Sequence, residues 1–327
     1  MADSRPRPIT RRAALAWAAV LSGAAHAQGA GAKPMRIVVG FGPGSFNDIA
    51  ARELARHMGE ILGQPIIVEN RPGAGGSVGT DVVAKAAPDG TTIGLGTSSQ
   101  MVMNVGLYRS LPFDVERDLR LIGLVGRTPL VLTGKAAGAK SLKALIADAR
   151  ARPGAVTYGS GGTGSISHIV GEAFARVADV QLTHVPYKGN GPAMADLAGG
   201  HVDLVFDGLA TSRPLATQGR ARMLAISGAR RNPAAPDLPT FAEQGVRDYE
   251  AYTWNCLMAP AATPPETIAR LNQALNQALA RPAIKERFDQ AGVDILGPST
   301  PAQAEAFGRK ERERWVPFVR SLKLEVN

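Results

Sequence analysis

Strand-like and helix-like segments alternate along most of this chain, and that alternation limits the folds open to it. Gly63 ends the first expected helix, and Pro88-Asp89-Gly90 ends the second. Strands that alternate with helices form a parallel sheet with helices on its faces. The pattern therefore predicts an α/β protein whose first elements are strand 35–39, helix 48–62, strand 65–69, helix 80–87 and strand 91–95.

The same alternation returns in the middle of the chain. Its clearest helix runs from Ile166 to Val177, with apolar residues at i, i+3, i+4, i+7, i+8 and i+11. The other elements expected there are strands 129–133, 156–158, 181–185, 202–206 and 223–227 and helices 141–150 and 190–199.

The C-terminal part is expected to be more helical. The capping-box pattern Thr263-x-x-Glu266 predicts a helix that continues to about Ala280. Thr300 followed by Pro301 predicts the start of a last helix, which continues through residue 315.

Length and composition set further limits. A chain of 327 residues, 45% of them hydrophobic, is long enough for about two folded domains. Its one cysteine, Cys256, excludes an internal disulfide and a cysteine-based metal cluster. The histidines after residue 27 show neither H-x-x-x-H nor H-x-H spacing, so no metal site is predicted. These histidines are His57, His168, His184 and His201.

A formal net charge of +9 raises the question of nucleic-acid binding. However, the basic residues are dispersed, and the chain has no basic arm with interleaved aromatic residues. This distribution argues against nucleic acid as a partner.

The N-terminus has the three parts of an export signal. Four arginines and one aspartate precede residue 13, the stretch 13–25 is apolar, and Ala25-His26-Ala27 resembles a peptidase site. We therefore predict an exported, periplasmic protein cleaved after about Ala27, and the alternative is an ordinary N-terminal helix. Thr10-Arg11-Arg12 also permits twin-arginine export, and the sequence does not choose between the routes. Cleavage would lower the formal net charge from +9 to +6.

Two glycine-rich loops share one layout, in which a strand leads into the loop and a helix follows it. We call Gly40 to Asp48 the first glycine loop and Gly159 to His168 the second. Glycine lets the backbone approach a ligand closely, and the start of a helix offers free N–H groups and a positive dipole end. Such a loop binds an anion without a basic side chain. Two such loops, one in each half of the chain, predict a cleft with one loop on either side. The alternative is that both are tight turns that bind no ligand.

Two enzyme motifs are present in incomplete form. The first glycine loop reads G-x-G-x-x-S, like a dinucleotide fingerprint with Glu69 as the ribose-binding acid, but Ser45 replaces the third glycine and Pro43 stiffens the turn. The G-x-S-x-G pattern around Ser77 is typical of hydrolases, but residues 70–74 separate it from the preceding strand. We therefore expect no catalytic residue and no cofactor.

Seven short motifs, taken in order, resemble the Bug-type extracytoplasmic solute receptors, which are the TctC-like substrate-binding proteins of tripartite tricarboxylate transporters. The resemblance covers Met35 to about Val326. The matching segments after the first glycine loop are 63–65 with 69–76, 84–90, 111–114, 158–160 with 164–168, 184–189, 199–204 and 206–207.

The resemblance implies a two-lobed periplasmic binding protein of type II-like fold. Each lobe would be a mostly parallel sheet flanked by helices, and two strands would cross between the lobes. Lobe one would be residues 33–130 plus 254–327, and lobe two residues 131–253. The protein would be a monomer that binds a small carboxylate and passes it to membrane permease subunits. The alternatives are a ligand sensor for a signalling partner and, less favoured, an exported hydrolase or dinucleotide-binding enzyme.

The resemblance also implies which residues line the cleft. Lobe one would contribute Phe41, Gly42, Gly44, Ser45, Phe46 and Asp48, with Thr97 and Ser98 beside them. Lobe two would contribute Ser160, Gly164, Ser165 and His168, and Tyr187 and Asp207 would select the distal end of the ligand.

The first glycine loop departs from the family pattern Pro-Phe-x-Pro-Gly-Gly-x-x-Asp. Ser45 and Phe46 stand where small residues are common, so Phe46 would narrow the cleft or stack on a planar ligand. Asp207 would repel a second carboxylate, which favours a ligand end that carries an amino or hydroxyl group.

Overall fold

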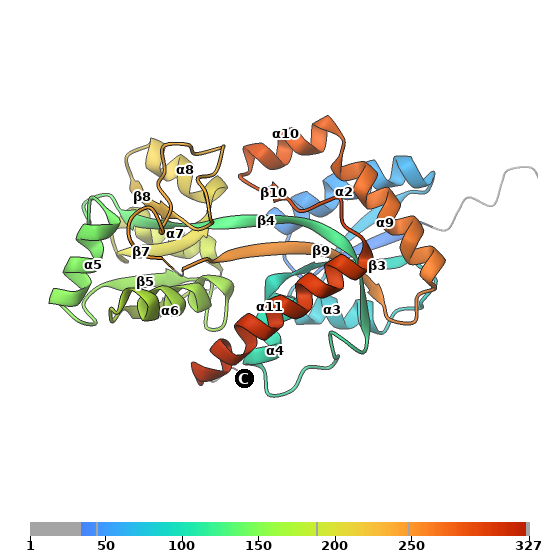
Figure 1. Cartoon of the computed structure of the whole chain (residues 1–327), viewed down its shortest axis with the longest axis horizontal. Helices are drawn as coiled ribbons and strands as arrows, with labels where there is room; N and C mark the ends of the chain where they lie inside the picture. The colour runs from blue at the N-terminus through green and yellow to red at the C-terminus, as the bar shows by residue number, and fades with distance from the viewer. Residues whose placement is uncertain (1–33, 44, 188, 248, 325–327) are drawn as a thin grey trace, which may run out of the picture.

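Two strands, β4 (Leu119–Lys135) and β9 (Tyr252–Pro260), run side by side through the centre of the molecule and join two lobes (Figure 1). They pair antiparallel, from Leu119 opposite Pro260 to Pro129 opposite Tyr252. The computed structural model describes residues 34–43, 45–187, 189–247 and 249–324, so the predicted export signal lies outside the described residues. The expected α/β fold with two lobes and two crossing strands is confirmed.

Lobe one holds both ends of the described chain. Its sheet has the order β2-β1-β3-β9-β4, in which β1 is parallel to β2 and β3, and β9 is antiparallel to β3 and β4. Before β4 it contains β1 (Met35–Val39), α2 (Phe46–Leu62), β2 (Ile66–Asn70), η1 (Ala74–Gly76), α3 (Ser77–Ala84), β3 (Thr92–Thr97), η2 (Ser99–Met103) and α4 (Asn104–Leu107). After β9 it contains α9 (Pro265–Leu279), α10 (Pro282–Gln290), β10 (Asp294–Ile295) and α11 (Pro301–Ser321).

Lobe two is built by the segment between the crossing strands. Its sheet has the order β4-β7-β5-β6, and β8 also pairs with the second half of β4. Its elements are α5 (Leu142–Ala151), β5 (Thr157–Ser160), α6 (Ile166–Ala178), β6 (Thr183–Pro186), α7 (Asn190–Gly199), β7 (Leu204–Gly208), α8 (Leu209–Thr217) and β8 (Ala221–Ile226).

Hydroxyl side chains cap four helices where the local sequence favours it. Ser45, Ser141 and Ser165 each accept a hydrogen bond from the backbone N–H three residues later, at the starts of α2, α5 and α6. Thr300 forms a complete capping box with the glutamine three residues later, at the start of α11. Each cap pairs an N–H group that would otherwise have no partner inside the helix.

The start of α9 differs from the prediction. The expected capping box at Thr263 and Glu266 is wrong, because the N-cap is Pro264 and no side chain caps the helix. Pro265 occupies the first helical position, where its fixed φ suits the helix and its missing N–H removes no hydrogen bond. The Thr263 hydroxyl is instead buried without a hydrogen-bond partner among the described residues.

One crossing strand is longer than the sequence indicated. The prediction placed a strand at 129–133, but β4 continues from Leu119 to Lys135. Residues 119–128 include two glycines and two arginines, which hide the strand pattern. The short helical segments η2, α4, α8 and α10 were not predicted either.

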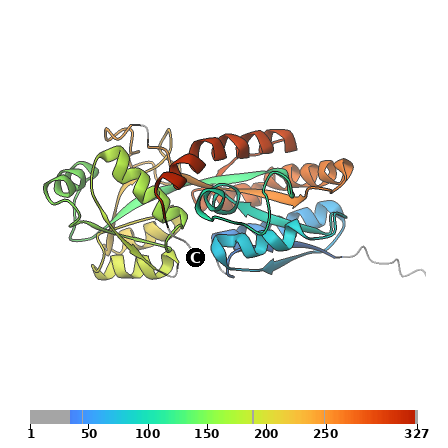
Figure 2. The same cartoon turned by 90° about the horizontal axis from the view of Figure 1, so that it is seen from below.

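Helix α11 bridges the two lobes along one side of the molecule (Figure 2). Trp315 and Val319 are buried in the largest apolar core. At the far end, the Arg176 guanidinium of α6 lies 5.4 Å from the centre of the Phe318 ring, and its Nη1 donates to Ser321 Oγ at 3.4 Å. The C-terminal end of a lobe-one helix therefore contacts lobe two.

The strand directions place the ends of the parallel strands of both lobes toward each other. In β9, Asn255 lies opposite both Thr97, the last residue of β3, and Gly126 of β4. Gly208, the last residue of β7, lies opposite Leu130 of β4. The ends of β3 and β7 are therefore offset by four residues of β4, about 13 Å along the strand. Loops that follow parallel strands form the usual ligand site of α/β sheets.

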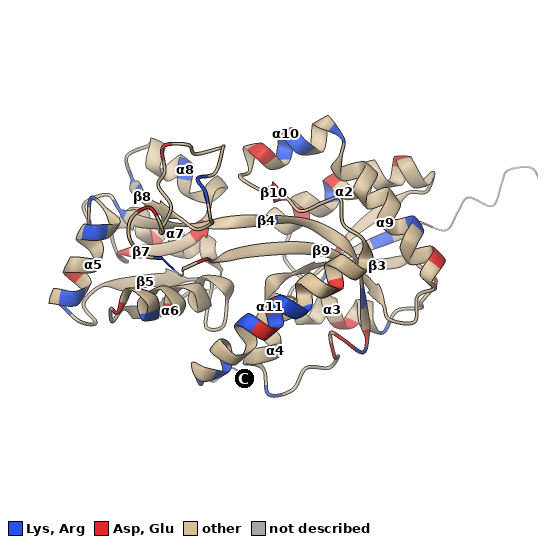
Figure 3. Ribbon diagram, in the orientation of Figure 1, with Lys and Arg blue, Asp and Glu red and all other residues tan. Residues whose placement is uncertain are grey.

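Charged side chains are interspersed over both lobes, with no large area of one sign in this view (Figure 3). No helix in the described part of the chain is long and apolar enough to cross a membrane. The described residues likewise contain no group of three or more His, Cys, Asp or Glu side chains that could hold a metal ion.

Candidate ligand-binding cleft

The first glycine loop leads from β1 to the N-terminus of α2. Ser45 Oγ accepts a hydrogen bond from Asp48 N at 3.2 Å and so caps the helix. A Cβ atom placed on Gly42 would have no other atom within 4 Å, so there is open space next to the backbone at this residue. Phe41 is half-buried and packs against the core of lobe one. Gly44 lies outside the described residues.

Asp48 holds the first glycine loop in place. Its carboxylate accepts hydrogen bonds from Arg52 Nε and from Asn70 Nδ2, both at 3.0 Å, and its side chain is only 4% exposed. The same Asn70 Nδ2 donates to the carbonyl oxygen of Phe41 at 2.9 Å. The structure therefore places Asp48 beneath the loop, where it links α2 to Asn70 at the end of β2.

Hydroxyl groups gather where β3 ends beside the crossing strands β9 and β4. Ser98 Oγ lies 3.0 Å from Thr253 Oγ1, and Thr253 is the cross-strand neighbour of Thr128. The Oγ1 atoms of Thr97 and Thr128 are buried without a hydrogen-bond partner among the described residues. We call Thr97, Ser98, Thr128 and Thr253 the hydroxyl floor. The sequence indicated Thr97 and Ser98 but missed Thr128 and Thr253, whose only signal was a polar residue within an apolar strand.

One further contact joins the crossing strand β9 to the first glycine loop. Asn255 Nδ2 donates to Asn47 Oδ1 at 2.8 Å, although the two residues are 208 positions apart. The crossing strand β9 therefore fixes the N-terminal turn of α2. Asn47 was expected only as part of the loop, and Asn255 was not predicted to take part.

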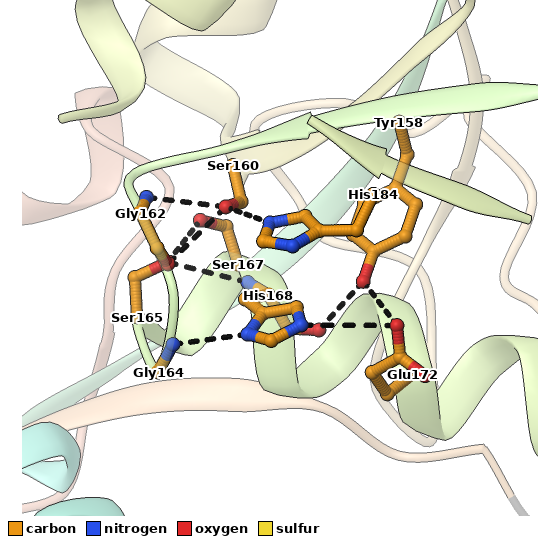
Figure 4. Close-up of polar contacts among 9 residues, drawn as sticks. All are labelled: Tyr158, Ser160, Gly162, Gly164, Ser165, Ser167, His168, Glu172 and His184. Carbon is orange, nitrogen blue, oxygen red and sulfur yellow. Dashed lines mark hydrogen bonds and ion pairs between the residues drawn. The ribbon is translucent and has the colours of Figure 1, made fainter. Parts of the chain in front are cut away.

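The second glycine loop leads from β5 to α6 and is held by its own polar side chains (Figure 4). Ser165 Oγ accepts from His168 N at 3.3 Å, and Gly164 N donates to His168 Nδ1 at 2.9 Å. Ser167 Oγ accepts from Gly161 N at 2.9 Å and donates to Asn190 Oδ1 at 2.8 Å. The loop is therefore pre-formed before any ligand binds.

Two histidine rings stack beneath this loop (Figure 4). The centres of the His168 and His184 rings are 3.8 Å apart, and the rings are within 9° of parallel. Burial lowers the pKa of both imidazoles to about 4, and for His184 the neighbouring His168 charge adds to this effect. Because Gly164 N donates to His168 Nδ1, that nitrogen carries no proton. Both rings are neutral at pH 7.

Ser160 lies on the inner side of the same loop. It has no exposed surface, and its Oγ lies 2.6 Å from His184 Nε2 and accepts from Gly162 N at 3.1 Å. Below it, Tyr158 OH donates to Glu172 Oε1 at 2.5 Å. The structure therefore brings Ser160, Gly164, Ser165 and His168 together, with His184 as a member that the sequence-based site omitted.

Tyr187 and Asp207 lie at the ends of β6 and β7. Tyr187 OH donates to Asp196 Oδ2 of α7 at 2.7 Å, and burial together with this bond raises the pKa of Tyr187 to about 12. Asp207 Oδ2 accepts from Thr211 Oγ1 at 2.8 Å, and the enclosed position raises the pKa of the Asp207 carboxyl. The Tyr187 hydroxyl is thus turned toward α7.

The two lobes touch beside the second glycine loop. Gly164 has φ +78°, and a Cβ at this position would lie 2.1 Å from Leu107 Cδ2 of α4 in lobe one. A cavity of about 320 Å³ is lined by α2 and α10 of lobe one and α8 of lobe two. A larger hollow of about 630 Å³, between α5 and α6, contains no residue of either glycine loop. Of these two, the cavity lined by both lobes is the one that contains a residue of a glycine loop, Phe46.

The hydrolase-like motif has no catalytic surroundings. Ser77 begins α3 directly after the short helix η1, and it accepts a hydrogen bond from Asn104 Nδ2 at 2.8 Å. It is 3% exposed, and no histidine contacts it among the described residues. A nucleophilic serine needs an adjacent base and access to substrate.

Comparison of this chain with known proteins shows which family it belongs to. Residues 50–324 match the profile described as "Tripartite tricarboxylate transporter family receptor", TctC. The chain belongs to this family. BugT of Bordetella pertussis is 39% identical over 291 residues, which is 88% of this chain and 89% of BugT. The periplasmic binding protein BugD is 32% identical, with TM-score 0.79 over 89% of this chain and 98% of BugD.

Two further TctC-like structures contain ligands. MatC of Rhodopseudomonas palustris, determined with malate bound, is 30% identical, with TM-score 0.79 over 88% of this chain and 98% of MatC. Rpa4515 of R. palustris, determined with adipate, is 32% identical, with TM-score 0.82 over 89% of this chain and 97% of Rpa4515. The chain is thus a Bug-type member of the TctC family, whose receptors are solute-binding proteins and not enzymes.

Proposed function

We propose that this protein captures a small carboxylate in the cleft between its lobes and delivers it to the permease of a tripartite tricarboxylate transporter. The observation that carries the proposal is the placement of two capped helix N-termini, those of α2 and α6. These helices follow β1 and β5, which are the parallel neighbours of β3 and β7, and the ends of β3 and β7 point toward each other along β4. Helix N-termini bind anions through free N–H groups. The malate and adipate of MatC and Rpa4515 are carboxylates, which supports the same ligand class.

The carboxylate would sit between the two glycine loops and above the hydroxyl floor. Backbone N–H groups near Gly42 and Gly164, with the hydroxyls of Ser45 and Thr97, would donate to its oxygens. Neither loop contains a lysine or arginine, so affinity would come from fixed donors rather than a guanidinium clamp. Ser98, Ser165 and Phe41 complete the proposed carboxylate contacts, and Phe46 would border the rest of the ligand rather than its carboxylate. Asp48, Ser160 and His168 would act by holding the loops in shape.

Tyr187 and Asp207 would border the far end of the ligand. An ionised Asp207, whose Oδ2 accepts from Thr211 Oγ1, would repel a second carboxylate, so we expect a neutral or cationic ligand end nearby.

Ligand capture would require the lobes to move. We place the lobe boundaries at residues 130/131 and 253/254, within the crossing strands. Bending there would open the cleft, and ligand contacts made to both lobes would favour the closed form. The closed monomer would then dock on the permease in the periplasm, after cleavage of the export signal near Ala27.

A melting-temperature screen of residues 28–327 tests the proposal. The probes are mono-, di- and tricarboxylates, amino acids and aromatic acids, with NAD as a comparison. A ligand that binds only the folded protein raises the melting temperature. A rise with at least one carboxylate supports the proposal, whereas a rise with NAD alone would refute it. Comparing solute uptake by cells with and without the gene then tests delivery.

A further inference from the structure

The cavity between the lobes has a mainly apolar wall. Phe46 and Ile49 of α2 and Phe288 of α10 form the lobe-one side, and Ala210 and Thr211 of α8 form the lobe-two side. Ala50 and Ala291 add small apolar surfaces, while Arg287 and Gln290 lie at its rim and are exposed. In Figure 1, α8 and α10 lie on the same side of β4.

The cavity adjoins residues of the proposed ligand site in both lobes. Phe46 directly follows Ser45, the cap of α2. Thr211 donates to Asp207 at the end of β7. A ligand whose carboxylate lies between the glycine loops can therefore extend its other end into this cavity.

The side chains of Phe46 and Phe288 give the cavity an aromatic wall suited to a flat apolar group. The Phe46 and Phe288 ring centres are 6.3 Å apart, with 58° between the ring planes. Phe288 is 2% exposed and fixed in the core, whereas Phe46 is half-buried, and Ile49 is 37% exposed. Large apolar side chains exposed beside a cleft are a typical feature of ligand sites.

The size of the cavity limits what it can hold. An apolar cavity of about 150 Å³ is sufficient for one benzene ring. The volume here is about 320 Å³, which is enough for a ring and a short linker. Because Arg287 is exposed and solvent screens its charge, it adds little discrimination.

We propose that this cavity holds the apolar body of the ligand, so that the receptor prefers carboxylic acids with a ring-sized apolar group over short dicarboxylic acids. This inference rests on the proposed carboxylate-binding function. Phe46 is its specificity-determining residue, because its ring reaches the cavity from the first position of α2. Ala210 limits the cavity from the other lobe.

Titration calorimetry of the cleaved protein tests the inference with 3-phenylpropanoate as the ring-bearing probe and succinate and malate as short probes. We expect 3-phenylpropanoate to bind at least tenfold more tightly than succinate. Phe46→Ala should weaken 3-phenylpropanoate about tenfold and change succinate less than twofold, because only the longer ligand reaches the ring. Ala210→Phe should also weaken 3-phenylpropanoate selectively, because it fills the cavity.

Ile67→Ala is the matched control, because Ile67 is a large apolar residue, 59% exposed, on β2 and outside the cavity. It should leave both affinities unchanged. If short acids bind more tightly than 3-phenylpropanoate, or if Phe46→Ala weakens both ligands equally, the inference is wrong while carboxylate binding stands. If no carboxylate binds at all, the proposed function itself fails.

Discussion

Two buried hydroxyl groups, one at the end of β3 and one on the crossing strand β4, offer a direct test of ligand capture. Thr97 Oγ1 and Thr128 Oγ1 have no hydrogen-bond partner among the described residues. A buried polar group without a partner costs about 1–3 kcal/mol of folding free energy. Thr97→Val and Thr128→Val keep the side-chain shape and remove that cost. We therefore expect each variant to be more stable than the parent protein by about 1 kcal/mol, which raises the melting temperature by roughly 2–4 °C.

The same substitutions should weaken ligand binding. A hydrogen bond to a charged group contributes about 1.5–3 kcal/mol, so losing one donor to the carboxylate lowers affinity roughly 10- to 100-fold. The prediction is thus a gain in stability with a loss of affinity, which a simple packing defect does not produce. Melting curves without ligand and calorimetry with the best carboxylate of the screen measure the two effects.

Thr263→Val is the matched control. Thr263 Oγ1 is also buried without a partner, but it lies before α9 and far along the sheet from the glycine loops. It should gain stability and keep its affinity. If Thr97→Val and Thr128→Val bind the carboxylate as tightly as Thr263→Val does, the hydroxyl floor does not contact the ligand and our reasoning about it is refuted.

Three other outcomes are expected. Folding lowers the pKa of His168 and His184 from the ordinary value near 6.5 to about 4, so the unfolded chain binds more protons than the folded chain between these pH values. The melting temperature should therefore fall as the pH drops from 6.5 to 4. The His168→Gln variant should show a shallower fall. Gly164 and Gly200 have φ of +78° and +80°, so Gly164→Ala and Gly200→Ala should each lower the free energy of unfolding by about 1 kcal/mol. Only at Gly164 would the new Cβ contact Leu107, so calorimetry should show a loss of ligand affinity for Gly164→Ala alone. Cys256, fully buried with a pKa raised to about 12, should react with a thiol reagent only after unfolding.

Features fixed by a few neighbouring residues could be predicted from the sequence. Helices α2, α5 and α6 begin within two residues of their expected starts, because the serine caps before them depend on contacts only three residues away. The failure at Thr263 has a local cause too, because two following prolines changed how the helix begins.

Features that depend on distant pairing could not be predicted. Ser98 and Thr253 are 155 positions apart and meet only because β9 lies between β3 and β4. The stacking of His168 on His184 requires β6 beside β5 with Tyr158 opposite His184. The role of Asp48 beneath the loop depends likewise on Asn70, which the parallel β1–β2 register brings near. Periodicity gives an element and its buried face but not its neighbour in a sheet.

The position of β9 between β3 and β4 has a consequence for the order in which the protein can fold. Strands β1, β2 and β3 are made early, but the strand that joins them to β4 begins at Tyr252. All strands of lobe two precede that residue, so lobe two can assemble its sheet while lobe one still has a gap. A chain that emerges from synthesis or from an export channel therefore completes its second lobe first. The first lobe closes last, when about three quarters of the chain has appeared.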